Sequence, residues 1–415
     1  MSTLPDWGDQ IAEETIRGIP FRMYTQRPRR VESLLPYAAR WGDRPHIVQG
    51  DRTLSFAQLH NAVLAKAKEL ATLGVVAGDR VLLLGWNSPE WVVNFWGCFQ
   101  AGAVPVLANA WWSAAELANA ARLVEPRLIL ADAHAAARLP AGWRSGLWGI
   151  TPSAQVDPSP AAPARDEEDT GLIIFTSGTS GQPKAVVLTH RAMLARLHMT
   201  LQVTRKLPHQ VDEAARDVTL ITGPLFHVGG MQTLMRAVIV GDTLVFPSGR
   251  YDPAEVLALI ESQKVNRWNA VPTMVSRLLD HPDVARRDLS SLKAISIGGA
   301  PVHKELMKRI RESLPSVSPR IPTGYGLTEN GGQATGSAGS EDVDKLGSTG
   351  RPMPLVEVKF LAHSGFPDGE ILLRSPTQMS GYFRLDESPI DAEGWLHTGD
   401  LGRLDEKGQL WITGR

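Results

Sequence analysis

Short apolar runs alternate with helix-like segments along most of the chain, and this alternation limits the possible folds more than any other feature. Residues 80–87, RVLLLGWN, read as a strand, and residues 89–102 read as a buried helix. The same order of strand and helix continues through residues 103–132. Apolar runs separated by helices are typical of βα units, in which helices cover both faces of a parallel sheet. The pattern therefore predicts an α/β fold.

A second series of the same kind follows a segment that breaks the pattern. Residues 148–169 are rich in proline, alanine and acidic residues and read as a surface connection. Apolar runs and helical segments resume between residues 170 and 329. Beyond about Gly336, short alternating runs with turns such as PDGE and DEKG indicate an antiparallel sheet or small barrel. We expect subdomains over residues 1–165, 166–335 and 336–415.

Two helices of the second series have particularly clear signals. Asp252 before Pro253 is a good N-cap with proline at the first helical position, which predicts a helix over residues 252–264. Residues 301–314 form the other predicted helix.

The charge balance and the cysteine content exclude several classes of protein. The 415 residues include 43 basic and 44 acidic ones, a formal net charge of -1, so no overall field draws the chain to nucleic acid. No run of about 18 apolar residues predicts a membrane span, and the N-terminus lacks a signal-peptide pattern. Cys98 is the one cysteine, which precludes an intrachain disulfide and fits a reducing, cytoplasmic location. We expect Cys98 to pack as a buried small hydrophobe.

The stretch FTSGTSGQPK, residues 175–184, has the composition of an anion-binding loop. It is not a P-loop, because the second glycine comes too early and alanine follows the lysine. Gly178 and Gly181 allow several backbone N–H groups to converge, and Lys184 adds a mobile positive charge. Four hydroxyl side chains complete the set: Thr176, Ser177, Thr179 and Ser180. Composition alone leaves a simple polar turn as the alternative.

This loop and five further motifs, in order, resemble the adenylate-forming superfamily of acyl-CoA synthetases, luciferases and peptide-synthetase adenylation domains. The five are PLFHVGG (224–230), GGAP (298–301), GYGLTE (324–329), GWLHTGD (394–400) and GR (414–415). The histidine motif is similar to that of the acyl-CoA synthetase branch. The resemblance implies a layered αβαβα body of two similar, mainly parallel sheets with flanking helices, and a small antiparallel β-barrel subdomain.

The resemblance also implies chemistry: a carboxylic acid is activated with ATP and Mg²⁺, and its acyl group passes to CoA. It assigns catalytic roles to Lys184, His227, Thr328 and Glu329, and a Mg²⁺ site to Thr176 and Glu329. A carboxylate beside phosphate oxygens suits this hard cation. The implied nucleotide-binding residues are Thr176, Ser177, Gly178, Thr179, Ser180, Gly181, Lys184, Gly299, Ala300, Pro301, Thr323, Gly324, Tyr325, Gly326, Thr328, Asp400 and Arg415.

The acid itself is expected to be hydrophobic. PLFHVGG has no acidic residue for a substrate ammonium, so a simple carboxylic acid is favoured over an amino acid. Some long-chain members have an aromatic gate where this chain has Met231, a more flexible side chain. Fatty, aryl and sterol-like acids all stay open. The expected acid contacts are His227, Val228, Gly229, Met231, Val271, Thr273, Gly298, Asn330 and Gly331.

Relatives with these motifs continue beyond GR into a small C-terminal domain that carries a further catalytic lysine. The chain is therefore expected to be the N-terminal body of such an enzyme, with low activity of its own. A ligase that loads a carrier protein and a non-catalytic nucleotide- or acyl-binding module are the alternatives. Trp111 and Trp112 cover either the core or a partner surface, so a homodimer is also open.

Overall fold

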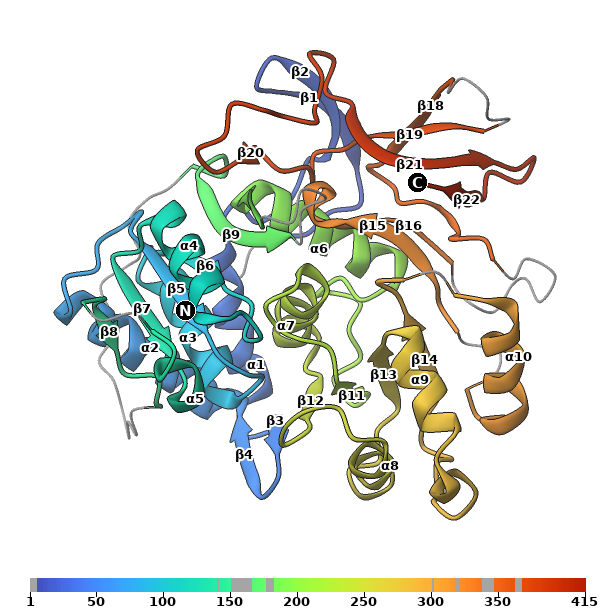
Figure 1. The fold of residues 1–415 in the computed structure, drawn as a ribbon, viewed down its shortest axis with the longest axis horizontal. Coiled ribbons are helices and arrows are strands. Elements are labelled where there is room, and N and C mark those ends of the chain that lie inside the picture. The colour runs from blue at the N-terminus through green and yellow to red at the C-terminus, as the bar shows by residue number, and fades with distance from the viewer. Residues whose placement is uncertain are drawn as a thin grey trace.

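Two mainly parallel sheets form the body of the protein (Figure 1). The computed structural model describes residues 6–139, 142–150, 166–176, 183–300, 302–317, 321–337, 347–362 and 368–415. The first sheet has the order β20-β10-β9-β6-β5-β7-β8. Its strands are β5 (Arg80–Leu84), β6 (Val104–Leu107), β7 (Leu128–Ala131), β8 (Ser145–Gly146), β9 (Thr170–Thr176), β10 (Lys184–Thr189) and β20 (Gly381–Tyr382).

The second sheet has the order β14-β13-β11-β12-β3-β4, and only its edge strand β4 is antiparallel. Its strands are β3 (Pro45–Gln49), β4 (Arg52–Ser55), β11 (Val218–Ile221), β12 (Thr243–Phe246), β13 (Arg267–Ala270) and β14 (Ala294–Ile297). Every residue of β6, β7 and β12 is buried, as expected for strands that are covered on both faces.

Helices lie between the sheets and on both outer faces, which confirms the predicted αβαβα layers. The central layer and the outer cover of each sheet have separate hydrophobic clusters. Between the sheets lie η1 (Val31–Tyr37), α1 (Ala38–Trp41), α2 (Phe56–Thr72), α3 (Pro89–Gln100), α6 (His190–Val203) and α7 (Val228–Val240). The outer helices are α4 (Ala114–Val124), α5 (Ala133–Ala136), α8 (Pro253–Ser262), α9 (Pro272–Leu279) and α10 (Lys304–Ser313), with η2 (Pro282–Ala285).

Helix starts follow local sequence. The Asp252 carboxylate accepts a hydrogen bond from the Ala254 N–H at 3.1 Å, so the predicted N-cap of α8 is confirmed. The other predicted helix, α10, begins at Lys304 rather than at residue 301.

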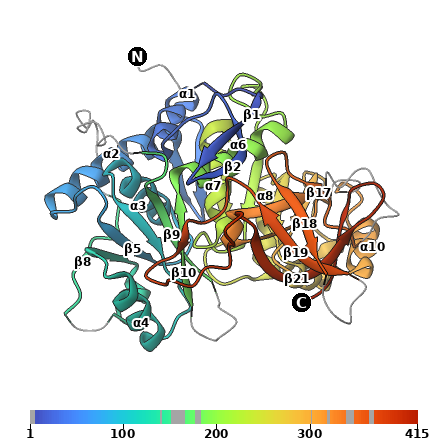
Figure 2. The same ribbon diagram turned by 90° about the horizontal axis from the view of Figure 1, so that it is seen from above.

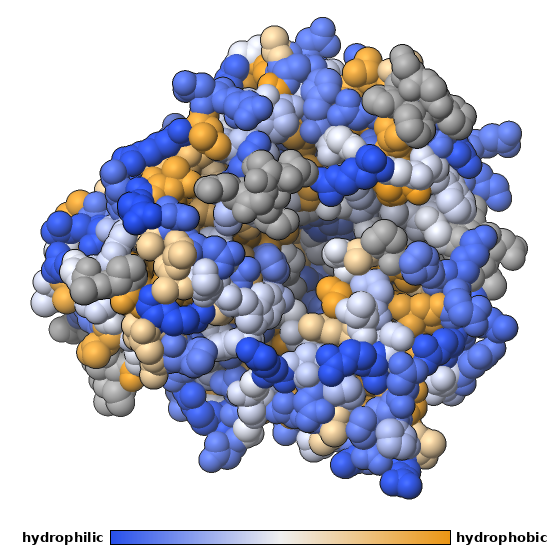
Figure 3. All heavy atoms as spheres, viewed as in Figure 1, coloured by the Kyte–Doolittle hydropathy of each residue, from blue (hydrophilic) through white to orange (hydrophobic). Residues whose placement is uncertain are grey.

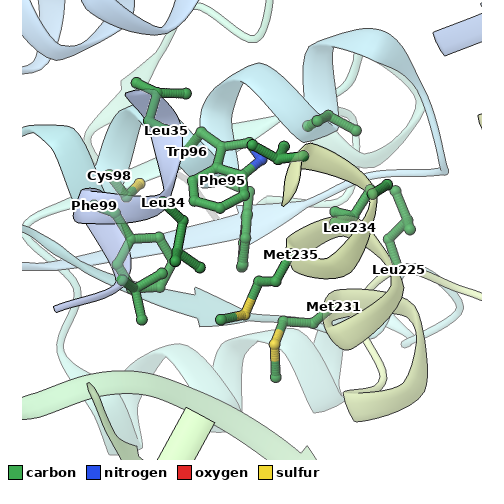
Figure 4. Close-up of a cluster of buried hydrophobic side chains, with 14 of the residues drawn as sticks. Leu34, Leu35, Phe95, Trp96, Cys98, Phe99, Leu225, Met231, Leu234 and Met235 are labelled. Atoms are coloured by element: carbon green, nitrogen blue, oxygen red, sulfur yellow. The ribbon is translucent and has the colours of Figure 1, made fainter. Parts of the chain in front are cut away.

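The central core is densely aromatic. Figure 4 shows Met231 and Met235 of α7 extending into the cluster that contains Phe95 and Phe99 of α3. Cys98 lies in the same cluster, and burial raises the pKa of its thiol to about 12. A thiol that is fully buried and protonated is a packing residue, as predicted.

The C-terminal strands are antiparallel, as predicted, but the expected barrel is wrong for the described residues. They form a sheet of β15 (Gly324–Leu327), β16 (Gly332–Gly336) and β17 (Arg351–Pro352), and a sheet of β18 (Glu357–Leu361), β19 (Gly369–Arg374), β21 (Leu396–Leu404) and β22 (Leu410–Gly414). The edge strands β18 and β22 do not pair with each other, so the larger sheet stays open. It buries its inner face against α6 and the hairpin of β1 (Ile11–Ile16) and β2 (Ile19–Tyr24). Seen from above, β18, β19 and β21 lie on the side of α10, away from β5 and β8 (Figure 2).

The sheets do not divide where the sequence suggested subdomains. Strands β3 and β4 precede residue 165 and belong to the second sheet, whereas β9 and β10 follow it and belong to the first. The proposed divisions stay predictions, but the described core runs across the first of them. No helix in the described part of the chain is long and apolar enough to cross a membrane.

Candidate active site

A cleft of about 1980 Å³ lies where the two α/β sheets meet the C-terminal strands. Figure 3 shows this face of the molecule hollowed near its centre. The cleft collects residues from β9, β10, the start of α7, the end of β14, β15, η3 (Thr328–Asn330) and β21. The predicted residues that line it are Thr176, Lys184, His227, Gly299, Ala300, Thr323, Gly324, Tyr325, Gly326, Thr328, Glu329, Asp400 and Arg415.

The predicted phosphate loop joins two antiparallel strands. Thr176 ends β9 and Lys184 begins β10, and the two residues are direct partners across the hairpin. The hairpin therefore holds the Thr176 hydroxyl and the Lys184 side chain at one end of the loop. Ser177, Gly178, Thr179, Ser180 and Gly181 lie outside the described residues, as does Pro301 of GGAP.

Tyr382 connects Lys184 with Glu329. Its hydroxyl donates a hydrogen bond of 3.0 Å to Oε1 of Glu329, and its ring centroid lies 4.8 Å from Nζ of Lys184. Burial and the Glu329 carboxylate raise the pKa of Tyr382, so the phenol stays protonated and donates. Nζ of Lys184 is also 3.8 Å from the carboxylate of Glu387, which is largely exposed, so this ion pair is weak.

Asp400 joins two other predicted residues across the cleft. The hydroxyl of Tyr325 donates to its Oδ2 at 2.7 Å, and Nε of Arg415 lies 3.4 Å from its Oδ1. Its backbone N–H donates to Oγ1 of Thr398 at 3.1 Å. Burial and this carboxylate raise the pKa of Tyr325. The arrangement presents a fixed carboxylate beside an aromatic ring, which suits a ribose with its base.

His227 occupies the N-cap of α7, and its ring faces the cleft. The neighbouring ring of Phe226 lies 4.9 Å away between centroids. The surrounding side chains partly remove the imidazole from solvent, which lowers its pKa. His227 is therefore neutral at neutral pH and can accept a proton or a hydrogen bond.

The other predicted acid contacts are more scattered. Val228 and Gly229 follow His227 on α7. Val271 and Gly298 directly follow β13 and β14, and Thr273 lies in the first turn of α9. Asn330 and Gly331 follow Glu329 directly. None of these seven lines the cleft, and their contacts with an acid stay predictions.

Met231 has a different place from the expected one. Its side chain is fully buried in the central cluster (Figure 4). Met231 packs in the core and does not line the cleft, and its expected contact with the acid stays a prediction.

A second cavity of about 540 Å³ adjoins the cleft. Trp111 and Phe226 line both spaces, and their rings meet edge-on at 5.2 Å between centroids. Trp112 is buried against Phe175, so it belongs to the core. Two exposed arginines, Arg250 and Arg277, also line the second cavity.

The AMP-binding enzyme family matches residues 36–383 of this chain. The chain belongs to this family. Its resemblance to the adenylate-forming enzymes, stated above from six motifs, is thereby confirmed, and this is a family of enzymes.

Individual members of the AMP-binding family are moderately similar to the chain. The 4-coumarate–CoA ligase-like protein 5 of Oryza sativa subsp. japonica is 31% identical over 90% of this chain and 69% of its own length. The 2-succinylbenzoate–CoA ligase of Bacillus licheniformis is 32% identical over 90% of this chain and 77% of its own. O-succinylbenzoate coenzyme A synthetase from Bacillus subtilis has been solved with AMP, at 28% identity and a TM-score of 0.78 over 92% of this chain and 78% of that chain. The same enzyme in complex with ATP and a magnesium ion is 27% identical to this chain. The TM-score is 0.76, and the match covers 91% of this chain and 78% of that chain.

Two residues in or beside this site, Tyr382 and Arg196, were not predicted from the sequence. Tyr382 lies in a stretch that resembled a plain strand, and it reaches Lys184 because β20 pairs with β10. Arg196 is buried on α6 and binds Gln333 of β16. An arginine within the apolar run MLARLHM is the one available signal, and it does not indicate a partner.

Proposed function

We propose that this chain forms the nucleotide- and acid-binding body of an ATP-dependent acid–CoA ligase. Its substrate is a hydrophobic carboxylic acid of the fatty, aryl or sterol-like kind. The observation that carries the proposal is the convergence of Lys184, His227, Glu329 and Asp400 on one cleft. These residues supply a cation, a neutral imidazole and two carboxylates on four different segments.

In the first step, an oxygen of the acid's carboxylate attacks the α-phosphorus of ATP. The bond from that phosphorus to the bridging oxygen breaks, and pyrophosphate leaves with its electron pair. Both reactants are anionic, so Lys184 lowers the barrier by neutralising phosphate charge. Asp400 orients the nucleotide by accepting hydrogen bonds from ribose hydroxyls.

The residues present fit a Mg²⁺ ion. Glu329 offers one carboxylate to the cleft and Thr176 a hydroxyl, and Mg²⁺ is usually held by one or two carboxylates together with phosphate oxygens and water. When bound, the ion would neutralise charge on the phosphates. Glu329 is the residue that would hold it, with Tyr382 fixing the carboxylate.

In the second step, the thiol sulfur of CoA attacks the acyl carbon, and the bond to the AMP oxygen breaks. The second cavity supports this step, because it meets the cleft at Trp111 and Phe226, and Phe226 directly precedes His227. Neutral His227 can receive the proton that the thiol loses. Arg250 and Arg277 suit the phosphates of CoA.

Pyrophosphate release and thioester formation, followed with a panel of acids with and without CoA, test the proposal. The protein that contains these residues should release pyrophosphate with at least one hydrophobic acid and form a thioester when CoA is present. Pyrophosphate without any CoA thioester would favour carrier-protein loading. No release with any acid would favour a binding module. The cytoplasmic location and the homodimer stay predictions.

A further inference from the structure

A bulge in β21 brings Asp400 to the cleft. The pairing with β19 passes from position 401 of β21 to position 397, while β19 advances only from position 370 to position 372. Residues 398–400 therefore stand opposite the single residue Ile371 and leave the ladder of backbone hydrogen bonds. Asp400, which lines the cleft, is the last of them. Its place in the cleft depends on the contacts that hold this bulge.

Two side chains tie the bulge to β19. Oγ1 of Thr398 donates a hydrogen bond of 2.7 Å to the carbonyl oxygen of Ile371 and accepts one of 3.1 Å from the N–H of Asp400. The N–H of Gly399 donates to Oε1 of Glu370 at 3.0 Å. Because this acceptor is a carboxylate, the bond is charge-assisted and stronger than a bond between two neutral groups.

Glu370 faces the cleft rather than the core. Its side chain is 20% exposed and lines the cleft. The second carboxylate oxygen, Oε2, lies 3.4 Å from Nδ1 of His397, whose ring also lines the cleft. The carboxylate therefore contacts β21 at the last paired residue before the bulge and again at Gly399 within it.

The backbone at Gly399 determines where the side chain of Asp400 points. Gly399 has a φ of 71°, in the left-handed region, so the chain turns sharply there. Glu370 holds the peptide bond between Thr398 and Gly399, and Asp400 follows directly. A rotation of this peptide would therefore shift the Asp400 carboxylate, and a displacement of about 1 Å can weaken the recognition of a bound group strongly.

We propose that Glu370 is a positioning residue for ribose recognition. Its carboxylate holds the bulge at Gly399 in the conformation that presents Asp400 to the ribose hydroxyls of the nucleotide. The proposal rests on the proposed function, in which Asp400 accepts hydrogen bonds from those hydroxyls. Because Glu370 acts through Asp400, its effect disappears for a nucleotide that has no such hydroxyls.

A nucleotide without ribose hydroxyls tests this role. AMP and 2′,3′-dideoxy-AMP are titrated by calorimetry into the wild-type protein and its variants. The wild type should bind AMP more tightly by roughly tenfold or more, because the analogue leaves the Asp400 carboxylate without its donors. Glu370→Ala should weaken AMP binding by about five- to twentyfold and leave binding of the analogue within about twofold.

Glu357→Ala is the matched control for the loss of a glutamate from this sheet. Glu357 belongs to β18, pairs with Arg374 of β19 at 2.8 Å and has a side chain that is 34% exposed. It does not line the cleft. This variant should therefore leave the affinities for AMP and for the dideoxy analogue unchanged.

Two conservative variants separate the reach of the Glu370 side chain from its charge. Glu370→Asp keeps the charge but is one methylene shorter, so it should lose AMP affinity as Glu370→Ala does, and it decides the matter if Glu370→Ala does not fold. Glu370→Gln keeps the length and an oxygen that accepts the Gly399 N–H, so it should stay within about threefold of the wild type. In the double variant Glu370→Asp/Asp400→Asn, AMP should bind as weakly as in Asp400→Asn alone.

Three results would overturn the role of Glu370. Unchanged AMP affinity in Glu370→Asp would show that the contact with Gly399 does not matter for binding. Equal losses for AMP and its dideoxy analogue would indicate a general structural role. Additive losses in the double variant would indicate that Glu370 contacts the nucleotide directly instead of acting through Asp400.

Pyrophosphate release by the wild-type protein distinguishes this proposal from the proposed function. Release with at least one acid, together with equal affinity for AMP and the dideoxy analogue, leaves the ligase assignment standing and overturns the role of Glu370. No release with any acid overturns the ligase assignment, and the AMP titrations then decide the role of Glu370 on their own. The absence of any AMP binding overturns both.

Discussion

The hydroxyl of Tyr382 donates a hydrogen bond of 3.0 Å to the carboxylate of Glu329, although the two residues are separated by 53 positions. Tyr382 belongs to the edge strand β20, and Glu329 to the short helix η3 that follows β15. Because the same ring lies under Nζ of Lys184, one neutral side chain fixes two groups of opposite charge. The aromatic face meets the cation, and the hydroxyl meets the anion.

Tyr382→Phe should lower kcat/KM for Mg²⁺-ATP by roughly tenfold, the effect of losing one hydrogen bond to a charged group. The phenyl ring keeps its contact with Lys184, so the affinity for AMP and the melting temperature should change little. Pyrophosphate release at varied Mg²⁺-ATP concentration measures the effect. An equal fall in AMP affinity would indicate a general disturbance of the cleft rather than the loss of a positioned carboxylate.

Glu329→Gln should weaken Mg²⁺-dependent turnover more than nucleotide binding. The amide keeps the shape of the side chain and can still accept from Tyr382, but it removes the negative charge that suits the ion. The ratio of the two losses is measured from initial rates at several Mg²⁺ concentrations and from AMP titrations. Comparable losses in both quantities would contradict the metal-holding role.

Asp400 and its two partners should differ strongly in their contributions to nucleotide affinity. Asp400→Asn should weaken AMP binding by about ten- to a hundredfold, because it removes a charged acceptor. Tyr325→Phe should have a smaller effect, since the ring remains. Arg415→Ala should be nearly neutral, because its side chain is 71% exposed and exposed ion pairs contribute little. Calorimetric titration with AMP ranks the three, and a larger loss for Arg415→Ala than for Asp400→Asn would refute this order.

The features that depend on local sequence pattern, namely the fold class and the motif residues of the cleft, were predictable from the sequence. The alternation of apolar runs predicted the α/β fold, and the family resemblance implied its layers. The ordered motifs identified Lys184, Glu329 and Asp400, which the structure brings to one cleft. Contacts between distant segments were not predictable in this way. The assignment of β3 to the second sheet requires pairing with β12, almost two hundred residues later. The prediction of a barrel was wrong, because alternation along each strand does not specify whether the two edge strands pair with each other.

Gly331 combines two backbone constraints beside Glu329. Its φ is 68°, and a Cβ would lie 2.4 Å from the carbonyl oxygen of Thr377. Gly331→Ala should therefore reduce the free energy of unfolding by about 1–3 kcal/mol, from the left-handed conformation and the close contact together. Gly229→Ala is the matched control, since nothing lies within 4 Å of its Cβ position and it is in helix α7. Urea unfolding measures both, and similar stability of the two variants would contradict the constraint at Gly331.

His46 should make the protein less stable in mild acid. The residue is fully buried, its Nδ1–H donates to the carbonyl of Asp242 at 3.1 Å, and Nε2 has no partner among the described residues. Burial lowers its pKa to about 4. The unfolded chain, with a histidine pKa near 6.5, binds the proton more tightly, so folding stability falls as the pH drops below about 6.5 and levels off near 4.

The contribution of His46 can be isolated by substitution. Lowering the pH from about 7 to about 5 should reduce the free energy of unfolding by about 2 kcal/mol through His46 alone. Burial also lowers the pKa of His198 to about 4, so His198 should add a similar loss. His46→Gln should flatten this part of the dependence, whereas substitution of the exposed His134 should not. Urea unfolding of the three proteins at both pH values provides the comparison. If His46→Gln and the wild type lose the same stability between the two pH values, His46 is not a source of the acid sensitivity.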